Sequence, residues 1–65
     1  MNKIREHRKQ RKWTQEALAQ RLGVERSAVA KWESGKSQPQ AAHLVALAEV
    51  FGCTVDEILG RSGKY

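Results

Sequence analysis

The stretch that decides the fold runs from Thr14 to Gly35 and reads TQEALAQRLGVERSAVAKWESG. Thr14 is a good helix N-cap, because its hydroxyl can accept a hydrogen bond from a backbone N–H of the first turn. Apolar residues follow at three- and four-residue spacing: Ala17, Leu18 and Leu22. This spacing predicts one apolar helix face, which Gly23 ends by taking the left-handed conformation.

The helical spacing of apolar residues resumes after Gly23 with Val24, Val29 and Trp32, and Gly35 is placed to end this second helix. The sequence therefore predicts a helix, a turn of about three residues and a second helix. Ala19 lies four residues before Gly23, where a small side chain lets the two helices cross closely. This pattern matches the helix-turn-helix, in which the second helix lies in the DNA major groove. A helical hairpin without a ligand is the alternative that the pattern alone leaves open.

Charge is unevenly distributed along the chain, which carries 12 Lys and Arg against 7 Asp and Glu and a net charge of +5. Residues 1–36 hold ten basic and four acidic side chains, whereas residues 37–65 hold two basic and three acidic ones. A cationic half joined to a near-neutral half is typical of a protein that docks one face on a polyanion. DNA and an acidic membrane surface both satisfy this description.

The length of 65 residues predicts a single domain over residues 1–65, with an ordered core over about 3–60 and a tail over 61–65. No run of 18 apolar residues and no signal-peptide pattern is present, so we expect no membrane span and a cytoplasmic location. Cys53 is the single cysteine and is expected to be a buried, reduced core thiol. His7 and His43 stand apart without further ligands, so we expect neither a metal nor a cofactor.

Three further helices are expected around this pair. The first covers about Lys3–Arg11, with Ile4, His7, Arg8 and then Trp13 near the core and with His7 partly buried. The other basic residues of this segment face either solvent or phosphate: Lys3, Arg5, Lys9, Arg11 and Lys12. A loop, KSQPQ, precedes a helix AAHLVALAEVF whose core stripe is Leu44, Leu47, Ala48 and Phe51. Thr54 and Glu57 form a capping box for a last short helix closed by Gly60. The fold class is therefore all-α.

Residues 3–59 resemble the Cro and phage-repressor helix-turn-helix family, also called the xenobiotic-response-element type. The positions that carry the likeness are Arg8, Thr14, Gln15, Leu18, Ala19, Leu22, Gly23, Val29, Trp32, Glu33, Gly35, Pro39, Leu44, Leu47, Ala48, Phe51, Gly52 and the segment 55–59. The resemblance implies a compact, lambda-repressor-like domain of five helices that binds operator DNA as a twofold dimer. Two positions depart from the family pattern: His7 replaces an aliphatic residue, and Glu25 replaces a Ser or Thr cap.

The resemblance also assigns residues to DNA contacts. It makes Gln15 a phosphate ligand and makes Arg26, Ser27 and Lys31 face the bases. Helical periodicity agrees, because turning Val29 and Trp32 inward at 100° per residue turns Arg26, Ser27, Ala30 and Lys31 outward. Arg26 suits guanine, Lys31 suits the same acceptors, and Ala30 suits a thymine methyl group. The phosphate-contacting set is predicted to be Arg11, Lys12, Thr14, Gln15, Ser34 and Lys36.

A structural ion pair between Arg8 and Glu33 is implied by the same resemblance. It would link the first helix to the recognition helix. Trp13 and Trp32 are interpreted as core residues, with stacking on bases as the alternative.

The sequence favours a sequence-specific, double-stranded DNA-binding regulator of transcription, repressor-like, acting on a palindromic operator as a homodimer that forms either in solution or only on DNA. A protein-interaction module of the same fold, such as an antitoxin or accessory factor, is the second hypothesis. Its candidate contacts are Val45, Val50, the last helix and Tyr65. An enzyme is disfavoured, because no nucleophile–base set, paired carboxylates or metal-spaced ligands are evident, and no small-molecule substrate is indicated.

Overall fold

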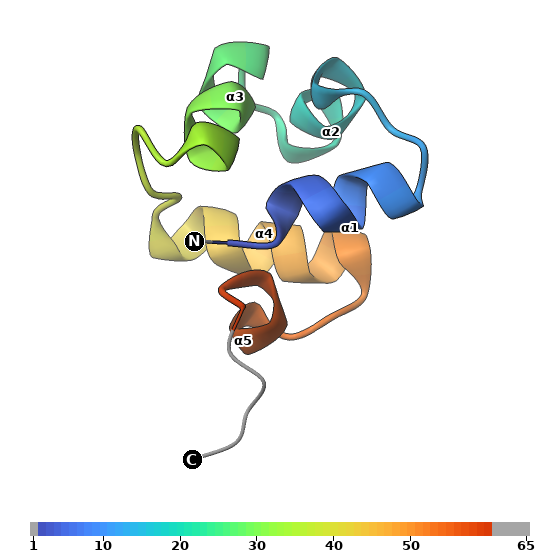
Figure 1. Ribbon diagram of the computed structural model, residues 1–65, viewed down its shortest axis with the longest axis vertical. Coiled ribbons are helices and arrows are strands. Elements are labelled where there is room, and N and C mark those ends of the chain that lie inside the picture. Colours follow the sequence, from blue (N-terminus) through green and yellow to red (C-terminus); the bar gives the residue numbers. More distant parts are fainter. Residues whose placement is uncertain (1, 61–65) are drawn as a thin grey trace.

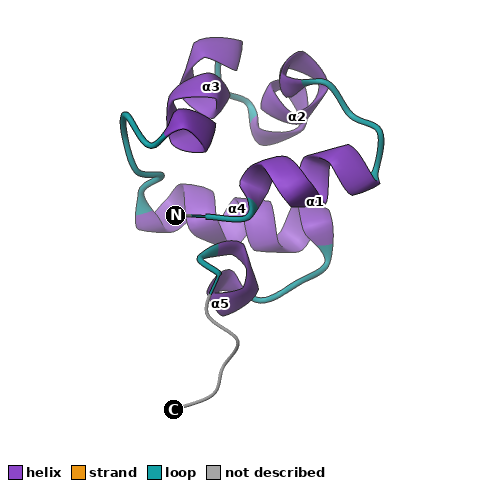
Figure 2. Cartoon of the chain, in the orientation of Figure 1, coloured by secondary structure: helices purple, strands orange, loops and turns teal. Residues whose placement is uncertain are grey.

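The computed structural model describes residues 2–60, which form five α-helices and no strand (Figures 1 and 2). They are α1 (Ile4–Gln10), α2 (Gln15–Leu22), α3 (Arg26–Ser34), α4 (Ala41–Phe51) and α5 (Val55–Ile58). In Figure 1, α2 and α3 lie together at one end, α1 and α4 lie in the middle, and α5 lies at the opposite end. The contacts between helices agree with this arrangement. Both α1 and α2 pack on α3 and on α4, and α5 packs on α4. The prediction of an all-α fold of five helices is confirmed.

The core draws side chains from every helix. Its buried members are Ile4, Leu18, Ala19, Val29, Trp32, Leu47, Phe51 and Ile58. Leu44 and Ala48, also predicted for the core stripe of α4, are half-buried and pack against this cluster. Because each helix contributes only one or two fully buried residues, the position of α3 depends on the packing of all the others.

The predicted helix ends are largely confirmed. The Thr14 hydroxyl accepts the Ala17 N–H at 3.0 Å, and Gly23 and Gly35 close α2 and α3 with φ values of 72° and 83°. Thr54 and Glu57 form the predicted capping box of α5. The left-handed Gly23 lets the chain turn directly after α2, which keeps the connection between α2 and α3 to residues 23–25.

Three expectations about individual positions need correction. The first helix is shorter than predicted, because Lys3 and Arg11 flank it as caps. Cys53 is half-buried rather than buried, although its thiol packs against the core and its pKa is raised, mainly by burial and also by the charge of Glu57. Trp13 is likewise half-buried at the edge of the core. Pro39 lies in a connecting loop, as predicted, and is buried there.

No helix within residues 2–60 is long and apolar enough to cross a bilayer. The predicted frayed tail over 61–65 lies outside the described residues.

Candidate nucleic-acid interface

The crossing of α2 and α3 is built around Ala19. Its side chain is only 2% exposed and belongs to the core that the two helices share. The Val24 N–H donates to the Ala19 carbonyl at 3.0 Å, which closes the turn between the helices. A small residue is needed here because a longer side chain has no room in a fully packed core. The predicted close crossing at Ala19 and Gly23 is therefore present.

The exposed side of α3 carries a stripe of polar side chains. Arg26, Ser27 and Lys31 are exposed, Ala30 is half-exposed, and Val29 and Trp32 are buried on the opposite side. The orientation predicted from periodicity is thus observed. This stripe offers a guanidinium for bidentate hydrogen bonds, an ammonium and a hydroxyl, within reach of the floor of a groove in which α3 would lie.

A buried ion pair joins α1 to α3. The Arg8 Nε donates to Glu33 Oε2 at 2.7 Å, and Nη2 donates to Oε1 at 3.0 Å. The third arm of the guanidinium, Nη1, donates to the Trp13 carbonyl at 2.8 Å. The two side chains are only 11% and 5% exposed. This bidentate geometry fixes the distance between α1 and the C-terminal turn of α3.

The ion pair also shifts the pKa values of its two members. Burial by itself raises the pKa of Glu33, but hydrogen bonds from Arg8 and Gln15 and the charges of Arg8 and Arg5 outweigh it. The pKa of Glu33 is therefore held below its ordinary value of 4.5. The hydrogen bond to Glu33 raises the pKa of Arg8, with burial acting in the opposite direction. Both groups are thus charged at neutral pH.

Gln15 connects this pair to the exposed stripe of α3. Its Nε2 donates to Glu33 Oε1 at 3.1 Å, and its Oε1 accepts a long hydrogen bond of 3.4 Å from Arg26 Nη1. Gln15 was predicted to contact phosphate, and its sequence neighbours do not reveal these two contacts, because the partners are 18 and 11 residues away. One N–H of the Gln15 amide is committed to Glu33, and the other is left for an external acceptor.

The remaining residues predicted to contact phosphate differ in whether their donor groups are free or already used in internal hydrogen bonds. Lys12 and Lys36 are exposed, and neither ammonium forms an ion pair with any residue between 2 and 60. The Thr14 hydroxyl accepts the Ala17 N–H, which leaves its own proton free to be donated. The Ser34 hydroxyl donates to the Lys31 carbonyl at 3.2 Å, so its proton is already used within α3.

Arg11 has an internal role that the sequence did not reveal. Its Nη1 donates to the His7 carbonyl at 2.9 Å, and its Nη2 donates to the Phe51 carbonyl at the end of α4. The guanidinium also lies 4.9 Å from the Phe51 ring centroid. These contacts commit Arg11 to joining α1 and α4, so we leave it out of the proposed phosphate set.

His7 is half-buried, as predicted, and stacks on Phe51 with ring centroids 5.1 Å apart. This stacking explains how an imidazole replaces the aliphatic residue of the family pattern: the ring face supplies the apolar contact. Glu25, the other departure, precedes α3 without a side-chain capping bond. The N-terminal N–H groups of α3 are therefore not capped by the Glu25 side chain.

Lys12 adopts a left-handed backbone conformation, with φ of 60°. This conformation costs a non-glycine residue roughly 1–2 kcal/mol, whereas glycine adopts it freely but loses roughly 0.4–1 kcal/mol more entropy on folding. We therefore expect Lys12→Gly to raise the free energy of unfolding by about 0.5–1 kcal/mol, measured by urea denaturation. Lys12→Ala is the matched control, since it removes the same charge and keeps the strain. Equal stability of the two variants would contradict this expectation.

Few exposed apolar side chains lie on the surface predicted to bind a protein partner. Val45 on α4 is 52% exposed, and no other large apolar side chain among residues 2–60 is exposed. Val50 is half-buried and packs against the core, and Tyr65 lies outside the described residues. A single exposed valine is ordinary for a protein surface and does not define a docking site.

Comparison with protein families gives a match to the model described as helix-turn-helix, over residues 4–58. The chain is also similar to a crystal structure of the P22 c2 repressor protein in complex with synthetic operator 9T in the presence of Tl⁺. That likeness has a TM-score of 0.84 and 32% sequence identity, and covers 95% of this chain and 91% of that chain.

Curated relatives include the HTH-type transcriptional activator BcrR of Enterococcus faecalis, 42% identical over 57 residues. The HTH-type transcriptional regulator AnsR of Bacillus subtilis is 38% identical over 61 residues, and the repressor protein C2 of Salmonella phage P22 is 35% identical over 57. These alignments cover 88%, 94% and 88% of this chain. The chain spans about half or less of the length of these relatives, namely 28%, 53% and 26%.

Proposed function

This chain belongs to the helix-turn-helix family, and from that premise we propose that it regulates transcription by binding double-stranded DNA at particular sequences. The observation that carries the proposal is the exposed polar stripe of α3, presented by a packed crossing with α2. The relatives named as transcriptional regulators and the P22 c2 repressor–operator complex support the same activity.

In the proposed complex, α3 lies in the major groove. Arg26 donates two parallel hydrogen bonds to guanine O6 and N7, and Lys31 donates to the same acceptors as a point charge. Ser27 adds a weaker contact that either donates or accepts, and the Ala30 methyl group touches a thymine methyl. The contact of Arg26 with Gln15 restrains the guanidinium before DNA arrives, which lowers the entropy lost on binding.

Phosphate contacts flank this stripe. Lys12, Thr14 and Gln15 precede or begin α2, and Lys36 follows α3. The positive end of the α2 helix dipole and the free amide N–H of Gln15 favour an anion at that position. These contacts fix the register of α3 on the duplex and carry no sequence information. Ser34 joins this set only when its hydroxyl leaves the Lys31 carbonyl.

We further propose that two copies bind a palindromic operator with half-sites about one helical turn, roughly 34 Å, apart. Occupancy would regulate transcription by occlusion or by contact with polymerase. The relatives include one protein named an activator and one named a repressor, so family membership is compatible with either sign of regulation.

The proposal is tested by selecting bound duplexes from a random pool with the full chain and sequencing them. We expect a consensus with two inverted half-sites whose centres are about one helical turn apart. A pool that shows no enriched sequence after several rounds would refute sequence-specific binding, and a single half-site would refute the dimer.

Replacing Arg26 with alanine tests the base-reading role directly. We expect Arg26→Ala to lose about 1–3 kcal/mol of binding free energy on the selected operator and to relax preference at one base position of each half-site. The measurement is a titration of operators substituted at single positions. Arg21→Ala is the matched control, because it removes an exposed arginine of α2 whose Cζ lies 4.1 Å from the Trp13 ring centroid, away from the exposed stripe of α3. An equal loss on random duplex would reassign Arg26 to phosphate.

A further inference from the structure

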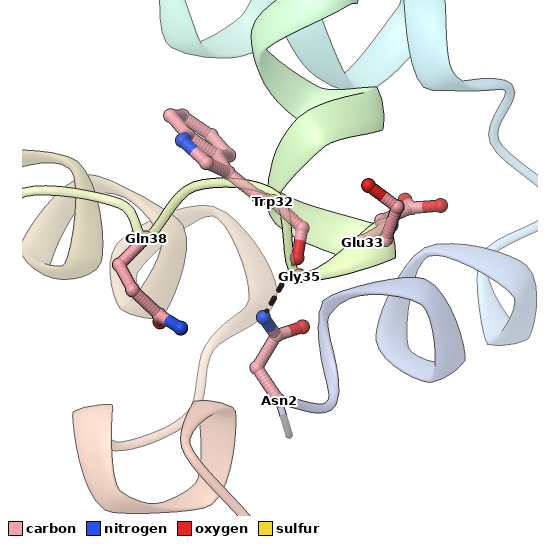
Figure 3. Close-up of a pocket in the computed structure, with 6 residues that line it drawn as sticks. Asn2, Trp32, Glu33, Gly35 and Gln38 are labelled. Atoms are coloured by element: carbon pink, nitrogen blue, oxygen red, sulfur yellow. Dashed lines mark hydrogen bonds between the residues drawn. The ribbon is translucent and has the colours of Figure 1, made fainter.

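Asn2 links the beginning of α1 to the end of α3. Its Nδ2 donates to the Trp32 carbonyl at 3.0 Å, a contact between residues 30 apart (Figure 3). Its Oδ1 accepts the Ile4 N–H at 3.2 Å. The same amide therefore holds the first turn of α1 with its oxygen and the last turn of α3 with its nitrogen.

The backbone next to Asn2 is itself anchored. The Lys3 N–H donates to the Ile58 carbonyl of α5 at 2.7 Å. Residues 2–3 thus form a short strap between α5 and α3, and Asn2 is held in place from both directions. Through its hydrogen bond to the Trp32 carbonyl, Asn2 therefore couples the position of α3 to the positions of α1 and α5.

Two attachments then connect α1 to the C-terminal turn of α3. Arg8 holds the Glu33 side chain from the last turn of α1, and Asn2 holds the Trp32 carbonyl from a position just before α1. In addition to the core packing of Val29 and Trp32, two polar attachments at different places along α1 oppose rotation of α3 relative to α1.

Trp32 itself packs into the core from the last turn of α3, with its ring centroid 5.1 Å from that of His43 on α4. Asn2 and Trp32 border an open pocket of about 300 Å³, whose other lining residues are Glu33, Ser34, Gly35 and Gln38 (Figure 3). Because the pocket is open, side chains do not fill the space beside this turn on the side that faces it. The hydrogen bond from Asn2 is the lateral brace that spans its edge.

We infer that Asn2 is a positioning residue for DNA recognition, which sets the angle of α3 through the Trp32 carbonyl. The inference rests on the proposed function of α3. Arg26 lies six residues from Trp32, or about 9 Å along the helix axis, so a tilt of about 10° moves it by roughly 1.5 Å. A displacement of this size misaligns a bidentate hydrogen bond to a base. Asn2 itself precedes the range 4–58 matched by the family model.

Asn2→Ser is the sharpest test in the full chain. A serine hydroxyl can still accept the Ile4 N–H, but it is too short to reach the Trp32 carbonyl, and the net charge is unchanged. Val50→Ala is the control for a general loss of stability, since Val50 lies on α4, packs against the core and takes no part in the hydrogen bonds of the strap. Binding is measured on the selected operator and on random duplex, and amide exchange is measured in the free protein.

We expect Asn2→Ser to lower the ratio of operator to random-duplex affinity by about two- to tenfold, the range of one hydrogen bond. Amide exchange should rise at Gly35 and Lys36, which donate to the last carbonyls of α3, and stay unchanged at Val24. Val50→Ala should lower the melting temperature and leave the affinity ratio unchanged.

Two outcomes overturn the inference while leaving the proposed function intact. One is an unchanged affinity ratio in Asn2→Ser when the unaltered chain is selective, whatever happens to amide exchange or stability. The other is an equal fall of the ratio in Val50→Ala, which would make the effect one of general stability. If the unaltered chain shows no preference for any duplex, the proposed function fails, and the role of Asn2 in recognition fails with it.

Discussion

Glu33→Ala is expected to lower the free energy of unfolding by about 3–5 kcal/mol, because it strands a buried guanidinium. Arg8 would lose two of its three hydrogen-bond contacts and keep only the Trp13 carbonyl. Gln15 would lose its acceptor on Glu33 as well. A domain of this length is stable by only about 3–10 kcal/mol in total. The melting temperature should therefore fall by more than about 10 °C, measured by circular dichroism.

A double variant separates the lost pair from the stranded charge. In Arg8→Met combined with Glu33→Leu, apolar side chains of similar volume replace both partners, so no uncompensated charge remains. We expect this variant to recover most of the stability that Glu33→Ala loses. A shift of only a degree or two in Glu33→Ala would show that the pair does not stabilise the fold.

The effect of Glu33→Ala should also depend on pH in a defined direction. The pKa of Glu33 is lowered in the folded chain from its ordinary value of 4.5. A carboxylate of this kind stabilises the fold above its unfolded-state pKa, and the contribution is lost as the pH falls through the folded-state pKa. The difference in stability between the unaltered chain and Glu33→Ala should thus be complete at pH 7 and shrink below pH 4.5. A difference independent of pH would contradict the assignment to the ion pair.

Raising the salt concentration from 50 to 200 mM is expected to weaken DNA binding by about 10³-fold. This magnitude follows from about six phosphate contacts in a twofold complex, each of which releases condensed counterions. In the proposed complex, each half-site contributes contacts from Lys12, from the N-terminus of α2 and from Lys36. The measurement is a salt titration on the selected operator and on random duplex, since phosphate contacts operate on both. Nearly flat titrations would favour the alternative of a protein-interaction module.

Lys12→Ala supplies the control for this titration. Removing one phosphate contact lowers the slope of log affinity against log salt by about one. A twofold complex loses the contact in both protomers, so the slope should fall by about two, whereas a monomer on one half-site should show a change of about one. An unchanged slope would remove Lys12 from the phosphate set while leaving its backbone strain unaffected.

The successful predictions from sequence share a physical origin. Thr14 as a cap, Gly23 and Gly35 as stops, and the capping box of Thr54 and Glu57 all depend on groups within three to five residues of each other. Such interactions are nearly the same in any protein that contains the segment. Apolar spacing adds the direction in which each helix faces, which is why the exposed stripe of α3 was predicted correctly.

The errors concern distant contacts and depth of burial, which the local sequence does not specify. Arg8 and Arg11 stand three residues apart, and helical spacing placed Arg8 near the core without identifying an acceptor for either guanidinium: Arg8 reaches Glu33 and Arg11 reaches the Phe51 carbonyl. The pairing of Arg8 with Glu33 came from the family resemblance and not from spacing. The depth of Cys53 and Trp13 was overestimated because apolar neighbours indicate contact with a core without fixing how completely the core covers a side chain.

The amino-acid sequence by itself determined the helices, their ends, the close crossing at Ala19 and the side of α3 that faces outward. Tertiary structure alone decided which polar groups meet: Gln15 with Glu33, Arg11 with Phe51 and Asn2 with Trp32, pairs separated by 18, 40 and 30 residues. A hydrogen-bond donor is the same chemical group whichever acceptor it finds. Its partner is chosen only when packing of the apolar core brings distant segments to within about 3 Å.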